Sequence, residues 1–145
     1  MGDDLYVICG FAGEETRDVH EFSQGKWTKL ADFPEGLVSR SVAAACALPT
    51  LNLICIFGGE VVASNLGHLG AGDFTNEVIA FSCSDKVVFK PTLVGESPAH
   101  RGWLDCALLD QGPDFAKVVY FGGLTGDDKA PVRMNDLWTL EIRKV

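Results

Sequence analysis

The hydrophobic positions of this chain fall into short runs that are each closed by glycine. Residues 53–57, Leu-Ile-Cys-Ile-Phe, precede the glycine pair 58–59, and residues 118–121, Val-Val-Tyr-Phe, precede the pair 122–123. A looser copy, Leu-Tyr-Val-Ile-Cys-Gly, occupies residues 5–10. Such runs are too short for a globular helix and are rich in β-branched and aromatic residues, so each predicts a buried strand. The glycines supply a turn that a Cβ atom would obstruct.

Further strands are predicted at fixed places around these runs. A strand is predicted after each glycine turn, at residues 18–22, 76–81 and 135–142. A segment that contains proline and ends in arginine precedes a strand of small apolar residues at 34–40 and again at 98–101. One pattern three times predicts a repeat architecture. With strands a to d in a full repeat, the chain is expected to contain b-c-d, a-b-c-d and a-b-c.

The repeated units resemble kelch repeats, the ~50-residue blades of a β-propeller. The resemblance rests on the glycine pairs, on Asn-Asp-Leu-Trp at 135–138 with its matches at 76–78 and 18–19, and on Trp27. Val-Phe at 88–89 stands where a second Trp is usual.

The expected fold is therefore all-β, with about three kelch blades of an incomplete β-propeller built from antiparallel four-stranded sheets. We expect one propeller segment over residues 1–145, with repeats at about 3–35, 36–95 and 96–145. Propellers close with roughly four to eight blades. The resemblance thus implies a segment of a longer propeller, or a chain that a partner completes. Another propeller segment, or self-association through open blade edges, is an expected partner.

Composition narrows the partners and the compartment. Twelve basic against twenty acidic residues give a net charge of −8, which argues against nucleic acid and against anionic membranes, since both are bound largely by Lys and Arg. No apolar run approaches the ~20 residues of a membrane span. The five cysteines form no CxxC pair and indicate buried free thiols in a reducing compartment. A cytoplasmic or nuclear location is expected.

The middle repeat carries a glycine-rich insertion between its b and c strands, at residues 60–73. In kelch propellers these b–c loops share a face with the segments that enter the inner strands. The resemblance therefore implies that Arg40, Arg101 and Trp103 lie near the insertion, on one face of the propeller, as candidate ligand-binding residues. Loops of this kind are common sites of function, because the sheet scaffold does not need them for its core.

The amino-acid sequence of the insertion resembles that of one branch of kelch proteins. This branch contains the nitrile-specifier, epithiospecifier and thiocyanate-forming proteins and their microbial relatives. That branch uses ferrous iron, which is assigned to a Glu-x3-Asp-x3-His motif. Glu60 and His68 match its outer positions, and Ser64 stands at the middle one. A hydroxyl is a poor neutral ligand where Fe(II) prefers imidazole and carboxylate. Asn65 or Asp73 are the substitutes available nearby.

Each candidate also has a structural explanation. Glu60 after a glycine pair is typical of a solvated or backbone-capping carboxylate, and His68 between glycines could hydrogen-bond its own loop. Arg40 and Arg101 occupy kelch positions that often brace the loop between blades. Trp103, at the start of an inner strand, is typical of core or channel lining.

Two functions remain open. The first is an intracellular scaffold that binds a protein or a small anionic ligand, and Ser64 favours it. The alternative is an Fe(II)-dependent, specifier-like lyase acting on glucosinolate-type aglycones, and Glu60, His68 and the arginines favour it. Fold alone does not decide between an enzyme and a binding module.

Overall fold

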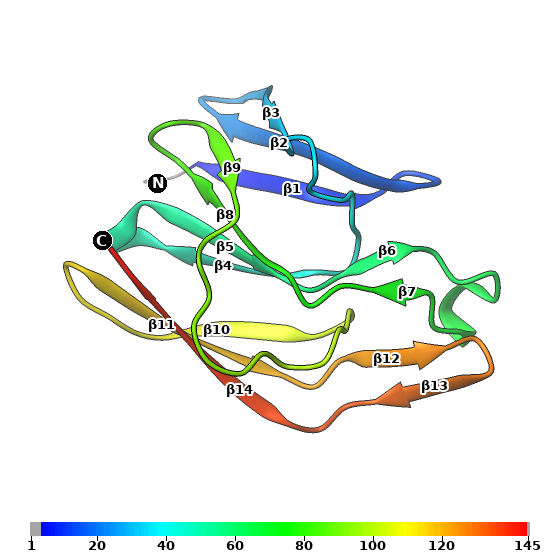
Figure 1. Cartoon of the computed structure of the whole chain (residues 1–145). Coiled ribbons are helices and arrows are strands. Elements are labelled where there is room, and N and C mark those ends of the chain that lie inside the picture. Colours follow the sequence, from blue (N-terminus) through cyan, green and yellow to red (C-terminus); the bar gives the residue numbers. More distant parts are fainter. Residues whose placement is uncertain (1–3, 145) are drawn as a thin grey trace.

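Three antiparallel sheets follow one another along the chain in the computed structural model, which describes residues 4–144 without the side chain of His68. The first sheet contains β1 (Leu5–Phe11), β2 (Glu15–Ser23) and β3 (Lys26–Asp32). The second contains β4 (Ala44–Leu48), β5 (Leu53–Phe57), β8 (Val78–Ser82) and β9 (Val87–Phe89). The third contains β10 (Asp105–Gln111), β11 (Phe115–Phe121) and β14 (Leu137–Arg143). Figure 1 shows the second sheet lying between the other two.

Two short ribbons extend the second and third sheets beyond their glycine pairs. The first ribbon pairs β6 (Glu60–Val62) with β7 (Asp73–Phe74), and the second pairs β12 (Leu124–Asp127) with β13 (Ala130–Arg133). Two 3-10 turns, Pro49–Leu51 and Gly67–Leu69, are the helical elements of the described range. The sequence predicts plain loops where the ribbons lie. The ends of each loop pair because they continue two strands that are already neighbours.

This arrangement confirms the expected fold class, an all-β chain consistent with an incomplete propeller. The three sheets contain strands b-c-d, a-b-c-d and a-b-c, in the predicted order. Four strands are present in the middle sheet, and three in each of the others. No helix among residues 4–144 is long and apolar enough to cross a membrane.

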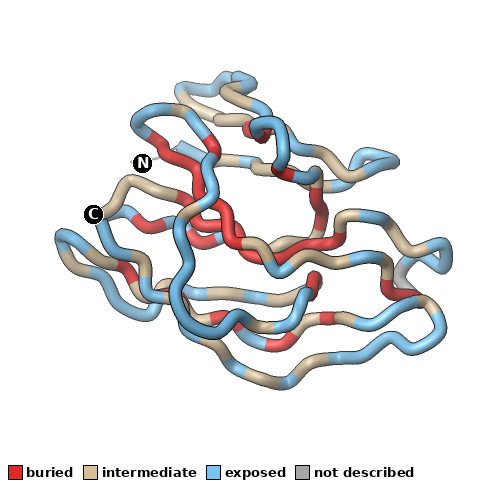
Figure 2. The backbone as a smooth tube through the Cα atoms, in the orientation of Figure 1, coloured by how far each residue is buried: buried red, intermediate tan, exposed pale blue. Residues whose placement is uncertain are grey.

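The core consists of two apolar layers, one on each face of the middle sheet. Successive side chains of a strand point to opposite faces. Ile54 and Ile56 accordingly pack toward the first sheet, whereas Cys55 and Phe57 pack toward the third. Figure 2 shows buried residues concentrated in the middle sheet. All five cysteines are free, and burial raises the pKa of the Cys55 thiol to about 11.

The turns that end β1, β5 and β11, the b strands of the three sheets, have the same left-handed backbone. Cys9, Gly58 and Gly122 have φ angles of 51°, 65° and 68°, and the glycine after each of them also has a positive φ. The amide of Gly58 donates to the carbonyl of Glu77, and that of Gly122 donates to the carbonyl of Asp136. These shared features identify equivalent positions in the repeats.

The second residue of this turn lies against the segment that leads to an inner strand. A Cβ atom on Gly59 would lie 2.8 Å from the carbonyl oxygen of Ser41, and one on Gly123 would lie 2.8 Å from that of Gly102. At Gly10, by contrast, a Cβ atom would meet no heavy atom within 4 Å. Gly59 and Gly123 are therefore required by space as well as by backbone conformation.

We predict that Gly59→Ala destabilises the protein more than Gly10→Ala. Both substitutions force alanine into a left-handed conformation, with φ of 112° at Gly59 and 143° at Gly10, which costs about 1–3 kcal/mol. The clash with Ser41 should add about 1–3 kcal/mol at Gly59 alone. Urea unfolding followed by circular dichroism measures both free energies. Equal losses would contradict the role assigned to the close approach.

Candidate functional site

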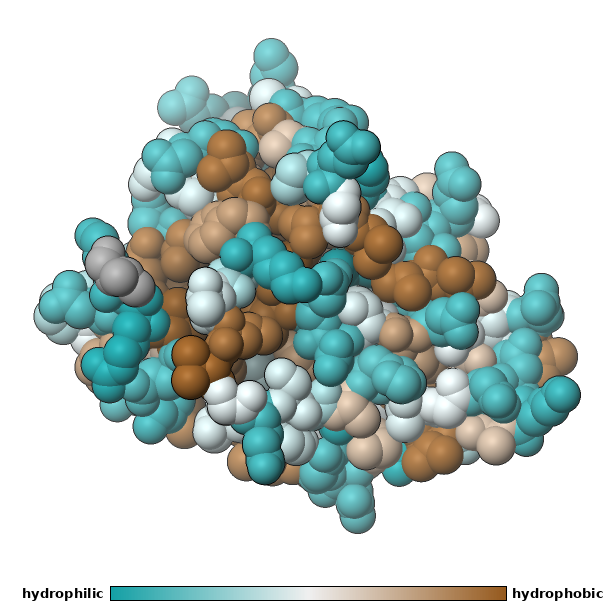
Figure 3. Space-filling view, in the orientation of Figure 1, coloured by the Kyte–Doolittle hydropathy of each residue, from teal (hydrophilic) through white to brown (hydrophobic). Residues whose placement is uncertain are grey.

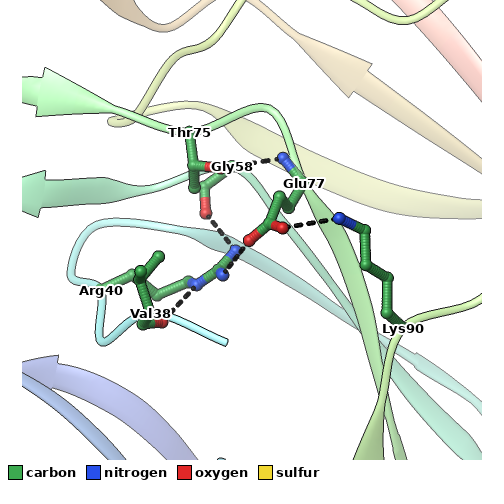
Figure 4. Close-up of polar contacts among 6 residues, drawn as sticks. All are labelled: Val38, Arg40, Gly58, Thr75, Glu77 and Lys90. Carbon is green, nitrogen blue, oxygen red and sulfur yellow. Dashed lines mark hydrogen bonds and ion pairs between the residues drawn. The ribbon is translucent and has the colours of Figure 1, made fainter. Parts of the chain in front are cut away.

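Arg40 is a buried cation that lies just before β4, the inner strand of the second sheet, and holds that sheet together. It is 0% exposed. Its Nη1 donates to the carbonyl of Gly58 at 3.2 Å, and its Nη2 lies 2.9 Å from Oε2 of Glu77 (Figure 4). Nε donates to the carbonyl of Val38 at 3.4 Å. Lys90 binds the other oxygen of Glu77 at 2.7 Å, so both carboxylate oxygens are paired with cations.

The backbone of Arg40 reaches the first sheet while its side chain remains in the second. Its amide donates to the carbonyl of Thr16 at 3.0 Å, and its carbonyl accepts from the amide of Gly10 at 3.0 Å. One residue therefore joins two neighbouring sheets by main-chain and side-chain hydrogen bonds together.

Arg101 repeats this arrangement between the second and third sheets. It is 2% exposed. Its Nη1 donates to the carbonyl of Gly122 at 3.0 Å and to Asp136 at 2.5 Å, and Nε donates to the carbonyl of Ala99 at 3.0 Å. Its backbone bonds to Thr75 and Gly59 of the second sheet. The hydrogen bond from Arg101, and then that from Trp138, hold the pKa of Asp136 well below its ordinary value.

Trp103 lies two residues beyond Arg101 and is half-exposed. Its φ is 56°, and Val42, at the same place after Arg40, has a φ of 46°. The amide of Trp103 donates to the carbonyl of Val42 at 2.9 Å. This hydrogen bond links the segment that leads into β4 with the segment that leads into β10. The structure thus brings Arg40, Arg101 and Trp103 into the loops between neighbouring sheets, and contact of any of them with a ligand stays a prediction.

Glu60 begins the first ribbon and is nearly buried, with 8% of its surface exposed. Its Oε1 accepts a hydrogen bond from the amide of Gly72 at 3.0 Å. A Cβ atom on Gly72 would lie 2.5 Å from the same oxygen and 2.0 Å from the carbonyl oxygen of Val62. The carboxylate therefore closes the base of the insertion, and only glycine fits opposite it.

Ser64 joins the insertion to the next repeat. Its hydroxyl donates to Oδ1 of Asp128 at 2.5 Å, and the amide of Ala71 donates to the same oxygen at 3.2 Å. Asp128 lies in the turn between β12 and β13, and sequence reasoning missed it. The signal available was the repeat itself, because residues 126–129 form the counterpart of the insertion in the third repeat.

The side chains around the insertion do not assemble a metal-binding set within the described part of the chain. No three His, Cys, Asp or Glu residues are grouped there so that they could hold an ion. The backbone of His68 lies in the 3-10 turn Gly67–Leu69, and its side chain lies outside the described residues. Glu60 and Ser64, the other two positions of the expected iron motif, hydrogen-bond to Gly72 and Asp128.

One hollow lies between the two ribbons, and a second lies at the strand ends away from them. An open hollow of about 290 Å³ lies between the ribbons and is lined by Ser64, Asn65, Asp73, Asp127 and Lys129, among others. A hollow of about 640 Å³ lies between the second and third sheets, lined by apolar residues such as Leu53, Phe89 and Ile142 and by polar ones such as Asp85, Lys90 and Arg143. Figure 3 shows hydrophobic side chains gathered over β8 and β9.

Comparison with known proteins agrees with this architecture. No protein-family model matches the chain. The structure of YjhT, which has a kelch-type fold, superposes with a TM-score of 0.57 at 19% sequence identity. The match covers 89% of this chain and 33% of YjhT, so the chain spans about a third of that protein's length. The fold is that of a kelch-like β-propeller. Each sheet can accordingly be called a blade.

We predict that Arg101→Met destabilises the kelch-like fold by about 1–3 kcal/mol at pH 7, because it leaves the carbonyl groups of Ala99 and Gly122 and the partly exposed carboxylate of Asp136 without their buried donor. The loss should shrink in acid. The folded-state pKa of Asp136 is depressed below 3.8, so the stability from its pairing is present above pH 3.8 and fades as the pH falls below it. Urea unfolding at pH 7 and pH 3 measures both effects.

The exposed Arg133 provides the matched control for this experiment. Arg133→Met should change the free energy of unfolding by less than about 0.5 kcal/mol, as is usual for surface positions. Similar losses from the two substitutions, or a loss for Arg101→Met that is independent of pH, would be inconsistent with the bracing role.

Proposed function

We propose that the chain is a kelch-like scaffold that binds a protein or a ligand on its rim. The rim consists of the two ribbons and their turns, residues 60–74 and 124–133. The observation that carries the proposal is the contact of Asp128 with both Ser64 and Ala71. This contact holds the insertion of the second blade against the ribbon of the third and so prepares a fixed surface before any partner binds.

The side chains on the rim suit a protein partner. Leu66 and Leu69 are 53% and 86% exposed at the turn of the insertion, and Val132 is 48% exposed on β13. Asp73 and Asp127 line the hollow beside them. Exposed apolar residues flanked by charge are typical of interaction surfaces. The negative charge of Asp73 and Asp127 favours a protein partner with basic residues over a small anionic ligand.

The free thiols support an intracellular location for this scaffold, cytoplasmic or nuclear. All five cysteines are unpaired, and disulfides are rare in those compartments. Burial also raises the pKa of the Cys106 thiol to about 12, which suits a structural rather than a reactive cysteine.

The alternative function is the Fe(II)-dependent, specifier-like lyase acting on glucosinolate-type aglycones. One observation favours it. Asp128 places a carboxylate beside Ser64, the position where the specifier proteins have aspartate. Glu60 and Asp128 would then be the oxygen donors available to an iron ion, and carboxylates are ligands that Fe(II) accepts. Without a described third ligand, this remains the second choice.

We predict that the double substitution Leu66→Ser and Leu69→Ser abolishes partner binding without unfolding the protein. Both side chains are exposed, so removing them costs little stability, whereas a partner would lose its apolar contact. Quantitative affinity capture compares the wild type with this variant and with Val94→Ser, a control at a position that is 97% exposed on another connection. Proteins retained by the wild type and the control but lost by the rim variant are expected. Identical retention by all three would refute the rim as the binding surface.

Anaerobic titration with Fe(II) tests the alternative. We predict weak binding by the wild type, stronger binding by Ser64→Asp, which adds a third oxygen ligand, and weaker binding by His68→Ala. Calorimetry measures the three affinities. Equal and negligible binding would remove the metal site altogether. Tight binding by the wild type that His68→Ala abolishes would place the lyase ahead of the scaffold.

A further inference from the structure

Three of the five cysteines lie in the apolar layer between the second and third blades. Cys46 and Cys55 are buried members of that layer, and Cys106 packs against it. Cys9 and Cys83 belong instead to the layer between the first and second blades. Neither the bracing by arginine nor the rim uses the three thiols that meet at the second junction.

Strand pairing places these thiols in two facing pairs of side chains. Cys46 of β4 pairs with Cys55 of β5 in the second blade, and Cys106 of β10 pairs with Tyr120 of β11 in the third. All four side chains lie in the same apolar layer, so the two pairs face each other across the junction. The inner strands β4 and β10 are in contact and run side by side in Figure 1. Cys46 and Cys106 are therefore facing cysteines of neighbouring blades.

The contacts across the junction select one pair of thiols. The thiol of Cys106 donates a hydrogen bond to the sulfur of Cys46, and Cys46 in turn donates a weak one to the carbonyl of Ala47 at 3.7 Å. The sulfur of Cys55 lies instead 3.4 Å from the hydroxyl oxygen of Tyr120. Cys106 is thus the cysteine toward which Cys46 is turned, although Cys55 is its neighbour within the sheet.

The two facing thiols differ in their access to solvent. Cys46 is 7% exposed, whereas Cys106 is half-buried. A dissolved oxidant therefore reaches Cys106 first, and Cys46 lies behind it as the second thiol. Burial raises the pKa of the Cys106 thiol to about 12. Because the thiolate is the reactive form, the pair reacts slowly at neutral pH and stays reduced unless the oxidant persists.

We propose that Cys46 and Cys106 form a reversible disulfide that joins the second and third blades when the protein meets a small-molecule disulfide such as oxidised glutathione. This link goes beyond the proposed function and does not depend on it, because it concerns the junction between the blades and not the rim.

The reaction is two successive thiol–disulfide exchanges. The thiolate of Cys106 attacks one sulfur of oxidised glutathione, so a mixed disulfide forms and one glutathione leaves and takes up the proton that Cys106 released. The thiolate of Cys46 then attacks the sulfur of Cys106, the bond to the second glutathione breaks, and that glutathione takes up the proton of Cys46. Two protein thiols are oxidised, and one glutathione disulfide is reduced to two thiols.

The disulfide would act on the stability of the junction. It encloses β5 to β9 and the insertion in one covalent loop, which restricts the unfolded chain and so stabilises the folded one. The blades that it joins are those whose ribbons meet through Ser64 and Asp128. The arginine braces are present at all times, whereas this link depends on the oxidant.

Oxidised glutathione is the probe, and the whole protein is incubated with it between pH 7 and pH 9. The products are alkylated, digested without reductant and analysed by mass spectrometry. We expect two of the five free thiols to be lost, a peptide pair that joins Cys46 to Cys106, and a higher urea midpoint of unfolding that dithiothreitol reverses. The rate should rise about tenfold per pH unit, since the thiolate fraction of Cys106 does so well below its pKa.

Cys106→Ala and Cys46→Ala should each abolish the link and the gain in urea midpoint. Cys83→Ala is the matched control, since Cys83 is a buried cysteine of the other apolar layer, and it should leave both unchanged. Glutathione adducts without the joined peptide, a link between Cys46 and Cys55, or no loss of thiols would overturn the proposal. The peptide map of the wild type decides this even where a cysteine variant fails to fold. The double rim variant should form the link normally, so failure of one proposal is distinguishable from failure of the other.

Discussion

A buried arginine at each junction between blades is the interaction on which the rest of the structure depends. A guanidinium in a protein interior is costly unless its charge and its donors are all satisfied. Arg40 and Arg101 meet this requirement with a carboxylate and two backbone carbonyls each. Their own backbones bond to the preceding blade. The charge therefore cannot be accommodated unless two blades and the turn at a glycine pair are all in place, which makes each junction specific for one geometry.

The junctions leave the outer ends of the blades free to vary, and the second blade has used this freedom. Its insertion is held by hydrogen bonds to Glu60 at the base and to Asp128 of the third blade at the tip. The two glycines that face these carboxylates, Gly70 and Gly72, have no room for a side chain. A loop held at both ends keeps its exposed leucines in a defined position, which is a property of binding surfaces formed in advance of the partner.

Sequence reasoning could predict the strands and the arginines because both repeat. It could not predict the acidic partners Glu77 and Asp136, since their approach depends on the register of the c strand against the b strand. Asp128 was missed for a similar reason, because its contact with Ser64 spans 64 residues. The ribbons were predicted as loops, since a three-residue strand such as β6 carries too few positions to show alternation.

The outward faces of the first and third blades are the remaining consequence of the repeat. Val7 lies at the place that Ile56 holds in the middle blade, and Phe121 at the place of Phe57. Both are about half-exposed, while their counterparts are buried. Each repeat thus has apolar residues on both faces of its sheet. Among the described residues, only the middle blade packs against a neighbouring blade on both faces. Since local stability follows apolar burial, β5 and β8 should be the last strands to open, whereas β1 and β14 depend on a single apolar layer each.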